Sequence, residues 1–225
     1  MVEHGAQGHN PVAGPPSERA RVRRYHQIAA YDPQVVYDIL DAMPLCHVGY
    51  VHNGSSFVTP TLQWRDGNRV FWHGSSASRM LKAVLEQDVC LTVSLYDGLV
   101  MARSAFSYNI NHRSVMIFGR PEKLADDDKE AQLRVMIDRM VPGQWDRLRP
   151  VTSQELKATT VLGMDITEAS AKIRTGPPVD AEEDYDFPVW AGVIPVRMQV
   201  LPPEPDPRNL PDVTVPDGVA QFSIG

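Results

Sequence analysis

One short stretch of the sequence combines residue types that could bind a phosphate group. Residues 71–82 read Phe-Trp-His-Gly-Ser-Ser-Ala-Ser-Arg-Met-Leu-Lys, so an expected strand ends, small residues turn the chain and an expected helix begins. The first N–H groups of a helix attract anions, the serine hydroxyls add donors, and the guanidinium of Arg79 suits a phosphate. The pattern indicates a phosphate cradle, although a serine-capped helix with a solvated arginine also fits it. It is not a P-loop, because no Gly-Lys-Ser/Thr follows.

Two other positions could contact a ligand. His73 shares one strand face with Phe71, where an imidazole could donate a proton near neutral pH or be a hydrogen-bonded structural residue. Pro60, between Thr59 and Thr61, interrupts an otherwise good strand. Because proline has no N–H, this position suits a bulge or edge approached by a ligand, or simply an edge strand.

The elements that must position these residues are mostly short strands. Hydrophobic periodicity predicts helices over residues 33–43, 77–86 and 126–140, and a short capped helix near 152–155. It predicts strands over residues 46–51, 57–64, 69–73, 89–96, 99–106, 113–120, 161–166 and 171–174. Tight turns join many of them, including an expected turn at Asp97-Gly98. We therefore expect a mainly β fold with helices (α+β), a small antiparallel barrel rather than a Rossmann fold.

Composition limits the class of protein. The 225 residues carry a net charge of −6, with 43% hydrophobic and 22% charged residues, which favours a globular protein and neither nucleic acid nor a membrane as partner. No apolar run is long enough to span a membrane, and the N-terminus lacks a signal-peptide core. Cys46 and Cys90 lie in apolar strands, as buried thiols do, and zinc spacings and Gly-x-Ser-x-Gly are absent. We expect a cytoplasmic protein without a metal site.

The chain divides into three expected parts. Residues 1–24, rich in glycine, proline and charge, suggest a flexible arm. Residues 25–197 form the expected globular domain. Residues 198–225 are rich in proline and predict an extended tail, which could lie on a partner.

Five motifs occur in order between residues 21 and 197. They are the stretch at 71–82, Asn-His-Arg-Ser-Val-Met-Ile-Phe-Gly at 111–119, Leu-Lys-Ala-Thr-Thr-Val-Leu at 156–162, Ser-Ala-Lys-Ile-Arg-Thr-Gly at 170–176 and Val-Trp-Ala-Gly-Val-Ile-Pro at 189–195. Together they resemble the pyridoxamine 5′-phosphate oxidase-like split-barrel superfamily. The closer similarity is to its flavin-nucleotide-binding branch, which is related to the nitroimidazole-resistance reductases.

The resemblance implies an antiparallel split β-barrel of the FMN-binding type. It further implies a homodimer that binds FMN at the subunit interface. Ser78 and Arg79 match the contact to the FMN phosphate, and His73 is the expected catalytic residue. The implied cofactor-binding residues are Thr59, Pro60, Thr61, His73, Gly74, Ser75, Ser78, Arg79, Met80, Arg113, Ser114, Lys172 and Trp190.

Two of these cations have alternative roles. Arg113 could reach the phosphate or pair with a carboxylate across the dimer. Lys172 shares a strand face with Arg174, where one of them could serve the phosphate or both could be solvated. The sequence leaves both choices open.

The expected function is that of an FMN-dependent oxidoreductase. It would pass electrons from a reduced nicotinamide donor to a small oxidised substrate, such as a nitro-aromatic or quinone-like compound. Pyridoxamine phosphate oxidation is less expected, because the basic residues for the substrate phosphate are not found at matching positions. The alternatives are a non-catalytic module that binds FMN or the deazaflavin F420, and a haem protein with His73 or His112 as axial ligand.

Overall fold

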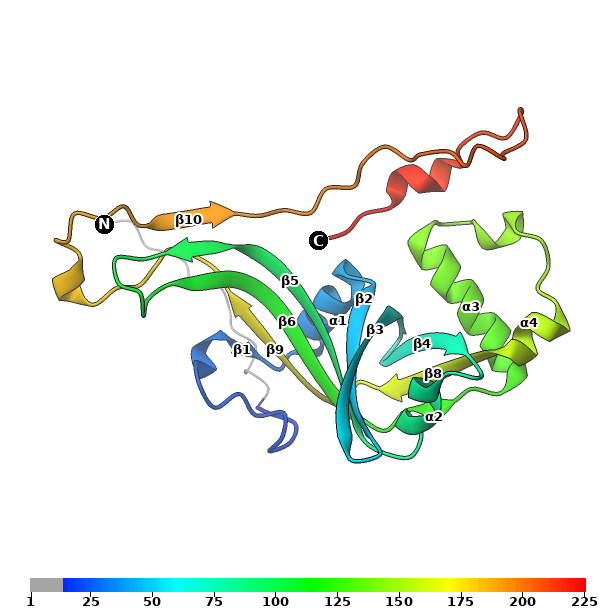
Figure 1. Cartoon of the computed structure of the whole chain (residues 1–225), viewed down its shortest axis with the longest axis horizontal. Coiled ribbons are helices and arrows are strands. Elements are labelled where there is room, and N and C mark those ends of the chain that lie inside the picture. The colour runs from blue at the N-terminus through cyan, green and yellow to red at the C-terminus, as the bar shows by residue number, and fades with distance from the viewer. Residues whose placement is uncertain (1–13) are drawn as a thin grey trace, which may run out of the picture.

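The computed structural model describes residues 14–225 and contains one antiparallel sheet with helices packed on it (Figure 1). The strands are β1 (Ala29–Ala30), β2 (Leu45–His52), β3 (Ser55–Asp66), β4 (Arg69–Ser75), β5 (Val89–Met101), β6 (Asn109–Gly119), β7 (Glu122–Lys123), β8 (Thr159–Asp165), β9 (Glu168–Arg174) and β10 (Gly192–Pro195). They follow the order β1-β9-β6-β5-β2-β3-β4-β8-β7, and β10 pairs with β5. The path does not close on itself, and this confirms the expected antiparallel split barrel.

Four α-helices accompany the sheet. They are α1 (Pro33–Ala42), α2 (Arg79–Val84), α3 (Asp126–Met140) and α4 (Ser153–Ala158), and the described chain adds 3₁₀ turns at His26–Ile28, Trp145–Arg147, Glu182–Asp184 and Asp217–Gln221. α1 begins as expected, with the side chain of Asp32 accepting a hydrogen bond from the Gln34 N–H at 2.8 Å and Pro33 in the first turn. α2 is shorter than the helix predicted over residues 77–86.

The turn predicted at Asp97-Gly98 is wrong. β5 runs without a break from Val89 to Met101, and its register against β6 shifts between Tyr96 and Gly98. β10 pairs with this part of β5, and a Cβ on Gly98 would lie 2.7 Å from the backbone oxygen of Ile194. The glycine therefore allows a bulge and a close approach of backbones, rather than a reversal of the chain.

Two hydrophobic clusters hold the fold together. The larger lies between α1, α2 and the inner face of the sheet and includes Val48, Trp72 and Leu91. The smaller lies under α3, where Met136 packs with Trp64, Phe71 and Val161 on the other face of β3, β4 and β8. The strands β3 and β4 thus separate two cores, and their residues alternate between them.

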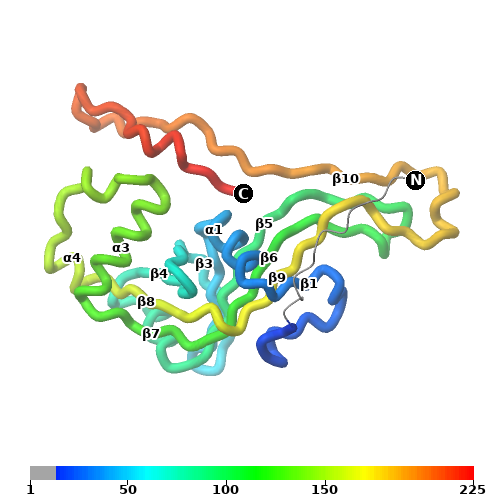
Figure 2. The backbone as a smooth tube through the Cα atoms, turned by 180° about the vertical axis from the view of Figure 1, so that it is seen from behind, coloured from blue at the N-terminus to red at the C-terminus, as the bar shows by residue number. Residues whose placement is uncertain are grey.

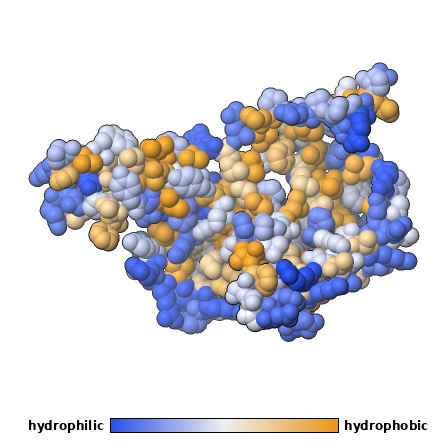
Figure 3. Space-filling model, in the orientation of Figure 1, coloured by the Kyte–Doolittle hydropathy of each residue, from blue (hydrophilic) through white to orange (hydrophobic). Residues whose placement is uncertain are grey.

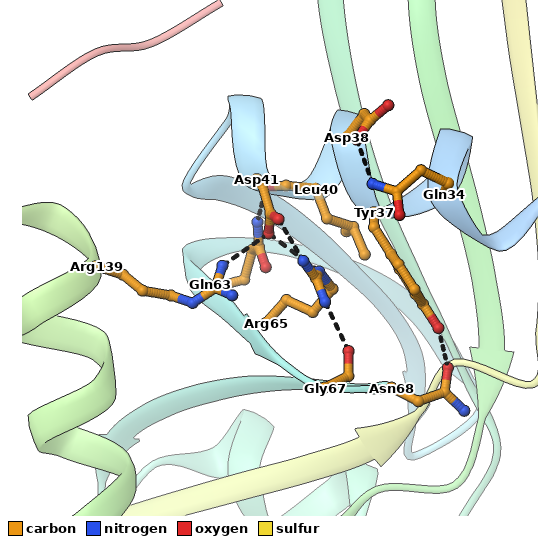
Figure 4. A network of polar contacts seen from close by, with 10 residues as sticks. All are labelled: Gln34, Tyr37, Asp38, Leu40, Asp41, Gln63, Arg65, Gly67, Asn68 and Arg139. Atoms are coloured by element: carbon orange, nitrogen blue, oxygen red, sulfur yellow. Dashed lines mark hydrogen bonds and ion pairs between the residues drawn. The ribbon is translucent and has the colours of Figure 1, made fainter.

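A buried amide connects β3 to α1. Gln63, which is 3% exposed, donates from Nε2 to the carbonyl oxygens of Leu40 and Met43 at 2.7 and 2.8 Å. Leu40 lies in the last turn of α1, where its carbonyl also accepts the Met43 N–H at 3.4 Å, and Met43 is the residue that follows the helix. Figure 4 shows the surface next to this amide, where Arg65 and Arg139 converge on Asp41. α1, β3 and α3 are therefore tied to one another on this side.

Both ends of the described chain pack on the body. Residues 14–24 lie in the expected arm, of which residues 1–13 are outside the described part; Arg19 pairs with Asp88 at 2.6 Å and also with Glu168. The segment after β10 crosses the molecule at a distance from the sheet (Figure 2), and the Gly225 N–H then donates to the Ala42 oxygen of α1 at 2.9 Å. Figure 3 shows an opening between this segment and the body, bordered by hydrophobic residues.

Candidate functional site

The strands β3 and β4 part in the middle of the molecule. They pair from Asp66 and Arg69 as far as Gln63 and Trp72, and no further. β3 continues along β2 from Leu62 to Ser55, and β4 continues along β8 to Ser75. Within the described chain, one side of β3 over residues 55–62 and one side of β4 over residues 73–75 pair with no strand. Such edges present free N–H and C=O groups, which suit a flat ligand with polar atoms on its rim.

The expected ring-binding residues lie on these two edges. Thr59, Pro60 and Thr61 are on β3, and His73, Gly74 and Ser75 are on β4. The Thr59 hydroxyl donates to the Tyr50 hydroxyl at 3.4 Å, so this threonine is held by β2. Pro60 pairs with His47 of β2 and is exposed on the outer face of the sheet. The two segments therefore lie on neighbouring strands, just beyond the point where their pairing ends.

His73 has an enclosed ring nitrogen without a partner. Its Nδ1 is buried and forms no hydrogen bond in the described chain, and its ring lies 5.9 Å from the Trp64 ring. Burial lowers the pKa of His73 below its ordinary value, because the charged imidazolium loses its hydration. A neutral imidazole with an orphan nitrogen beside an open strand edge can accept a proton, donate one or bind a metal of a cofactor.

The turn between β4 and α2 is built by its serines. The Ser75 hydroxyl accepts a hydrogen bond from the Ala77 N–H at 3.2 Å, and the Ser78 hydroxyl caps α2 by accepting from the Leu81 N–H at 3.4 Å. Each hydroxyl still has its own proton to donate. A Cβ at Gly74 would lie 3.1 Å from the Leu81 side chain, so glycine lets α2 pack close to β4. Ser78 can therefore cap α2 through its hydroxyl oxygen and still donate its hydroxyl proton to a ligand.

Arg79 is held against an aromatic pair. Its guanidinium lies 4.7 Å from the centroid of the Phe57 ring, and Phe57 stacks on Tyr50 with centroids 5.5 Å apart. Among the described residues Arg79 has no hydrogen bond and no ion pair. Its N–H groups are therefore positioned but not used, as a phosphate site requires.

The neighbouring Met80 occupies a different environment. Its side chain is 8% exposed and packs in the larger hydrophobic cluster with Leu81 and Val84. The structure therefore gives Met80 a role in holding α2 on the sheet, and only its backbone remains for a cofactor.

The other expected residues lie far from this turn within one chain. Ser114 on β6 and Lys172 on β9 pair with each other, and along the sheet they lie three and four strands from β3. Arg113 forms a two-pronged ion pair with Asp97, at 2.7 and 3.0 Å. Trp190 is 64% exposed and lies just before β10. These four residues therefore lie on other elements than the turn that carries Arg79.

Some contributors gave no sequence signal of their own. Tyr50 and Phe57 orient Arg79, but their stacking depends on the register of β2 and β3. Lys82 stands three residues after Arg79, a helical spacing that places both on one side of α2 and could have identified it.

Two other kinds of feature are absent from the described residues. None of the helices there is both long and apolar enough to cross a membrane. Nor do three or more His, Cys, Asp or Glu side chains in that part of the chain form a group able to hold a metal ion.

Comparison with known proteins places this geometry in a family. The family model described as pyridoxamine 5′-phosphate oxidase matches residues 32–173. No curated protein matches the sequence.

Solved structures of other proteins share this architecture, and the following three are among them. The flavocytochrome Anf3 from Azotobacter vinelandii is 58% identical, with a TM-score of 0.93 over 95% of this chain and 100% of its own. The FAD and haem binding protein from Mycobacterium smegmatis is 34% identical, with a TM-score of 0.83 over 87% and 97%. A putative 5-nitroimidazole antibiotic resistance protein from Bacteroides thetaiotaomicron, at 18% identity and a TM-score of 0.55 over 65% and 86%, shares the fold. The chain thus belongs to the pyridoxamine 5′-phosphate oxidase-like family of split-barrel proteins.

Proposed function

We propose that the protein is a flavin-dependent redox protein that also holds haem. Two similar proteins support this: a flavocytochrome at 58% identity and an FAD and haem binding protein at 34% identity. The observation that carries the proposal in this chain is the parting of β3 and β4. It leaves two free strand edges beside a neutral histidine and an unpaired arginine.

The flavin fits this arrangement in two places. Its flat ring needs an apolar slot with backbone donors and acceptors around its rim, and the edges of β3 and β4 provide these groups. Its phosphate needs a cation and hydroxyl donors, which Arg79, Ser75 and Ser78 provide.

The choice between two flavins is part of the proposal. The motifs favour FMN, whereas the similarity to an FAD and haem binding protein favours FAD. We take FAD as the resident flavin. Extraction of the purified protein and chromatography of the released flavin distinguishes the two.

Haem fits the environment of His73. An axial imidazole must be neutral, and burial already keeps His73 neutral. Its orphan Nδ1 and the adjoining aromatic ring of Trp64 give it an apolar neighbourhood. His112, the other candidate ligand, lies on β6 with its Nδ1 3.5 Å from the Ile110 oxygen. We therefore assign the haem ligand to His73.

A second copy of the chain would complete the site. Ser114 and Lys172 lie three and four strands from β3 in their own chain, and Trp190 precedes β10. The outer face of the large sheet also carries exposed apolar side chains, among them Leu45, Val58 and Met116. Exposed apolar patches of this kind mark interfaces, so we propose a homodimer packed through this face.

The proposal also names the electron donor and the electron acceptor. A bound flavin supplies hydride and single-electron chemistry. The chain would receive electrons from a reduced nicotinamide and pass them to a small oxidised acceptor. Anaerobic mixing with NADH or NADPH should bleach the flavin; a flavin that neither donor bleaches would favour a binding module without turnover.

Absorption spectroscopy tests the cofactors directly. The purified protein should show flavin bands and a Soret band. His73→Ala should lose the Soret band and keep the flavin, whereas His112→Ala should keep both. Retention of the Soret band in His73→Ala would overturn the haem assignment. A colourless protein that takes up F420 but neither FMN nor FAD would overturn the flavin assignment.

A further inference from the structure

A cavity lies next to the expected position of the flavin phosphate. It has a volume of about 520 Å³ and lies between α2 and the turn that joins β2 to β3. Arg79 and Lys82 line it from α2, and His52 and Asn53 line it from the turn. Its volume falls in the range of small-molecule sites, which is roughly 300–1,000 Å³. Because Arg79 belongs both to this cavity and to the phosphate turn, the two sites are continuous.

The positively charged side chains that line the cavity form no ion pair within the described chain. Arg79 and Lys82 stand one helical turn apart, and neither charged side chain has an ion pair or hydrogen bond to another described residue. Glu86, two residues after the end of α2, also lines the cavity. The charge along the groove therefore changes from positive at Arg79 and Lys82 to negative at Glu86. Such a gradient suits a ligand whose anionic part precedes a part rich in hydroxyl groups.

The wall of the cavity is fixed by a glutamine clamp. Gln87 accepts a hydrogen bond from the Val51 N–H at 2.9 Å and donates to the Val51 oxygen at 2.7 Å. The same amide nitrogen donates to the Ala83 oxygen of α2 at 3.0 Å. α2 and β2 are thus held at a constant separation. The His52 ring packs edge-on against the Phe57 ring, and the Arg79 guanidinium also lies over that ring.

We propose that this groove binds the adenylate half of FAD. The inference rests on the proposed flavin function and extends it. With the ring at the parted strands and the first phosphate at Arg79, a group attached beyond that phosphate can leave along α2. Lys82 would then meet the second phosphate, Glu86 would accept from a ribose hydroxyl, and the His52 ring would lie beside the adenine.

Titration of flavin-free protein with FAD and with FMN tests the proposal. The wild type should bind FAD at least about tenfold more tightly than FMN. Lys82→Ala should weaken FAD about tenfold, as expected for one charge-assisted hydrogen bond, and leave FMN within about twofold. Lys82→Arg should restore most of the FAD affinity. Lys157→Ala, an exposed lysine on α4, is the matched control and should change neither affinity.

The outcomes separate this inference from the function on which it rests. Equal binding of FAD and FMN by the wild type would overturn the groove assignment while the flavin function stands. The groove assignment would also fail if Lys82→Ala weakened both flavins equally, or neither. Failure of the wild type to bind either flavin would overturn the proposed function itself.

Discussion

At the scale of single residues, the candidate site depends on groups that are oriented but unpaired. Arg79 lies over Phe57 without a carboxylate, and His73 has an enclosed nitrogen without a hydrogen bond. An arginine that is already positioned loses less side-chain entropy when it meets an anion. The free energy of flavin binding should therefore depend strongly on this one side chain.

Replacing Arg79 tests that dependence. Arg79→Ala removes charge-assisted hydrogen bonds worth about 1.5–3 kcal/mol, so flavin affinity should fall by about one to two decades. Fluorescence quenching during titration measures the change. An unchanged dissociation constant would remove Arg79 from the phosphate site.

The lowered pKa of His73 predicts a pH dependence of stability. The unfolded imidazole titrates near its ordinary pKa of 6.5, and the folded one titrates below it. Below about pH 6.5 the unfolded state therefore binds more protons, and the free energy of unfolding should fall as the pH falls. His73→Gln should flatten this acid-side slope. Urea denaturation from pH 5 to 8, at matched flavin content, measures it; identical slopes would contradict the assignment.

At the scale of elements, β3 is the strand on which the site depends. It pairs with β2 over residues 55–62 and with β4 over residues 63–66, and it carries the buried amide of Gln63. That amide satisfies two carbonyls at the end of α1 and so fixes the position of β3. A change at Gln63 should affect folding more than ligand binding.

Gln63→Leu tests this structural role. The Met43 carbonyl would lose the donor that Gln63 supplies and the Leu40 carbonyl would keep only the Met43 N–H, at a cost of about 1–3 kcal/mol, so the midpoint of urea denaturation should fall clearly. Gln154→Leu, at an exposed position of α4, is the control and should have little effect. An unchanged midpoint for Gln63→Leu would show that water satisfies the carbonyls.

Local signals predicted most elements but not their long-range pairing. The strand–turn–helix around Ser78 was predictable, because the serine cap and the apolar face of α2 are encoded within a few residues. The continuity of β5 was not, because Asp97-Gly98 reads locally as a turn and only pairing with β6 and β10 keeps it extended. The stack of Tyr50, Phe57 and Arg79 also depends on register, which a single sequence does not reveal.

At the scale of the whole molecule, the large sheet leaves an apolar face uncovered. Val58 is 68% exposed and Met116 is 44% exposed on this face. The segment after β10 adds further exposed apolar residues, such as Leu201 and Leu210. A chain with these surfaces should not remain single in solution.

A charge on the outer face tests the homodimer. Met116→Glu should convert a dimer into a monomer, because a buried unpaired carboxylate is costly, while leaving the fold intact. Light scattering coupled to gel filtration measures the mass. Leu148→Glu, an exposed apolar residue next to the Trp145–Arg147 turn, is the control and should remain dimeric. A monomeric wild type would contradict the proposal.

The parted strands have a consequence for the lifetime of the protein in a cell. Without a ligand, the amides on the unpaired edges of β3 (residues 55–62) and β4 (residues 73–75) lie open to solvent exchange and to proteases, since no strand in the described chain covers those edges. A bound flavin ring would form hydrogen bonds with these edges in place of a neighbouring strand. Because the flavin binds the folded state, each increase in free flavin would increase the folded population by mass action. The abundance of this protein in a cell should then rise and fall with the supply of the vitamin from which the flavin is made.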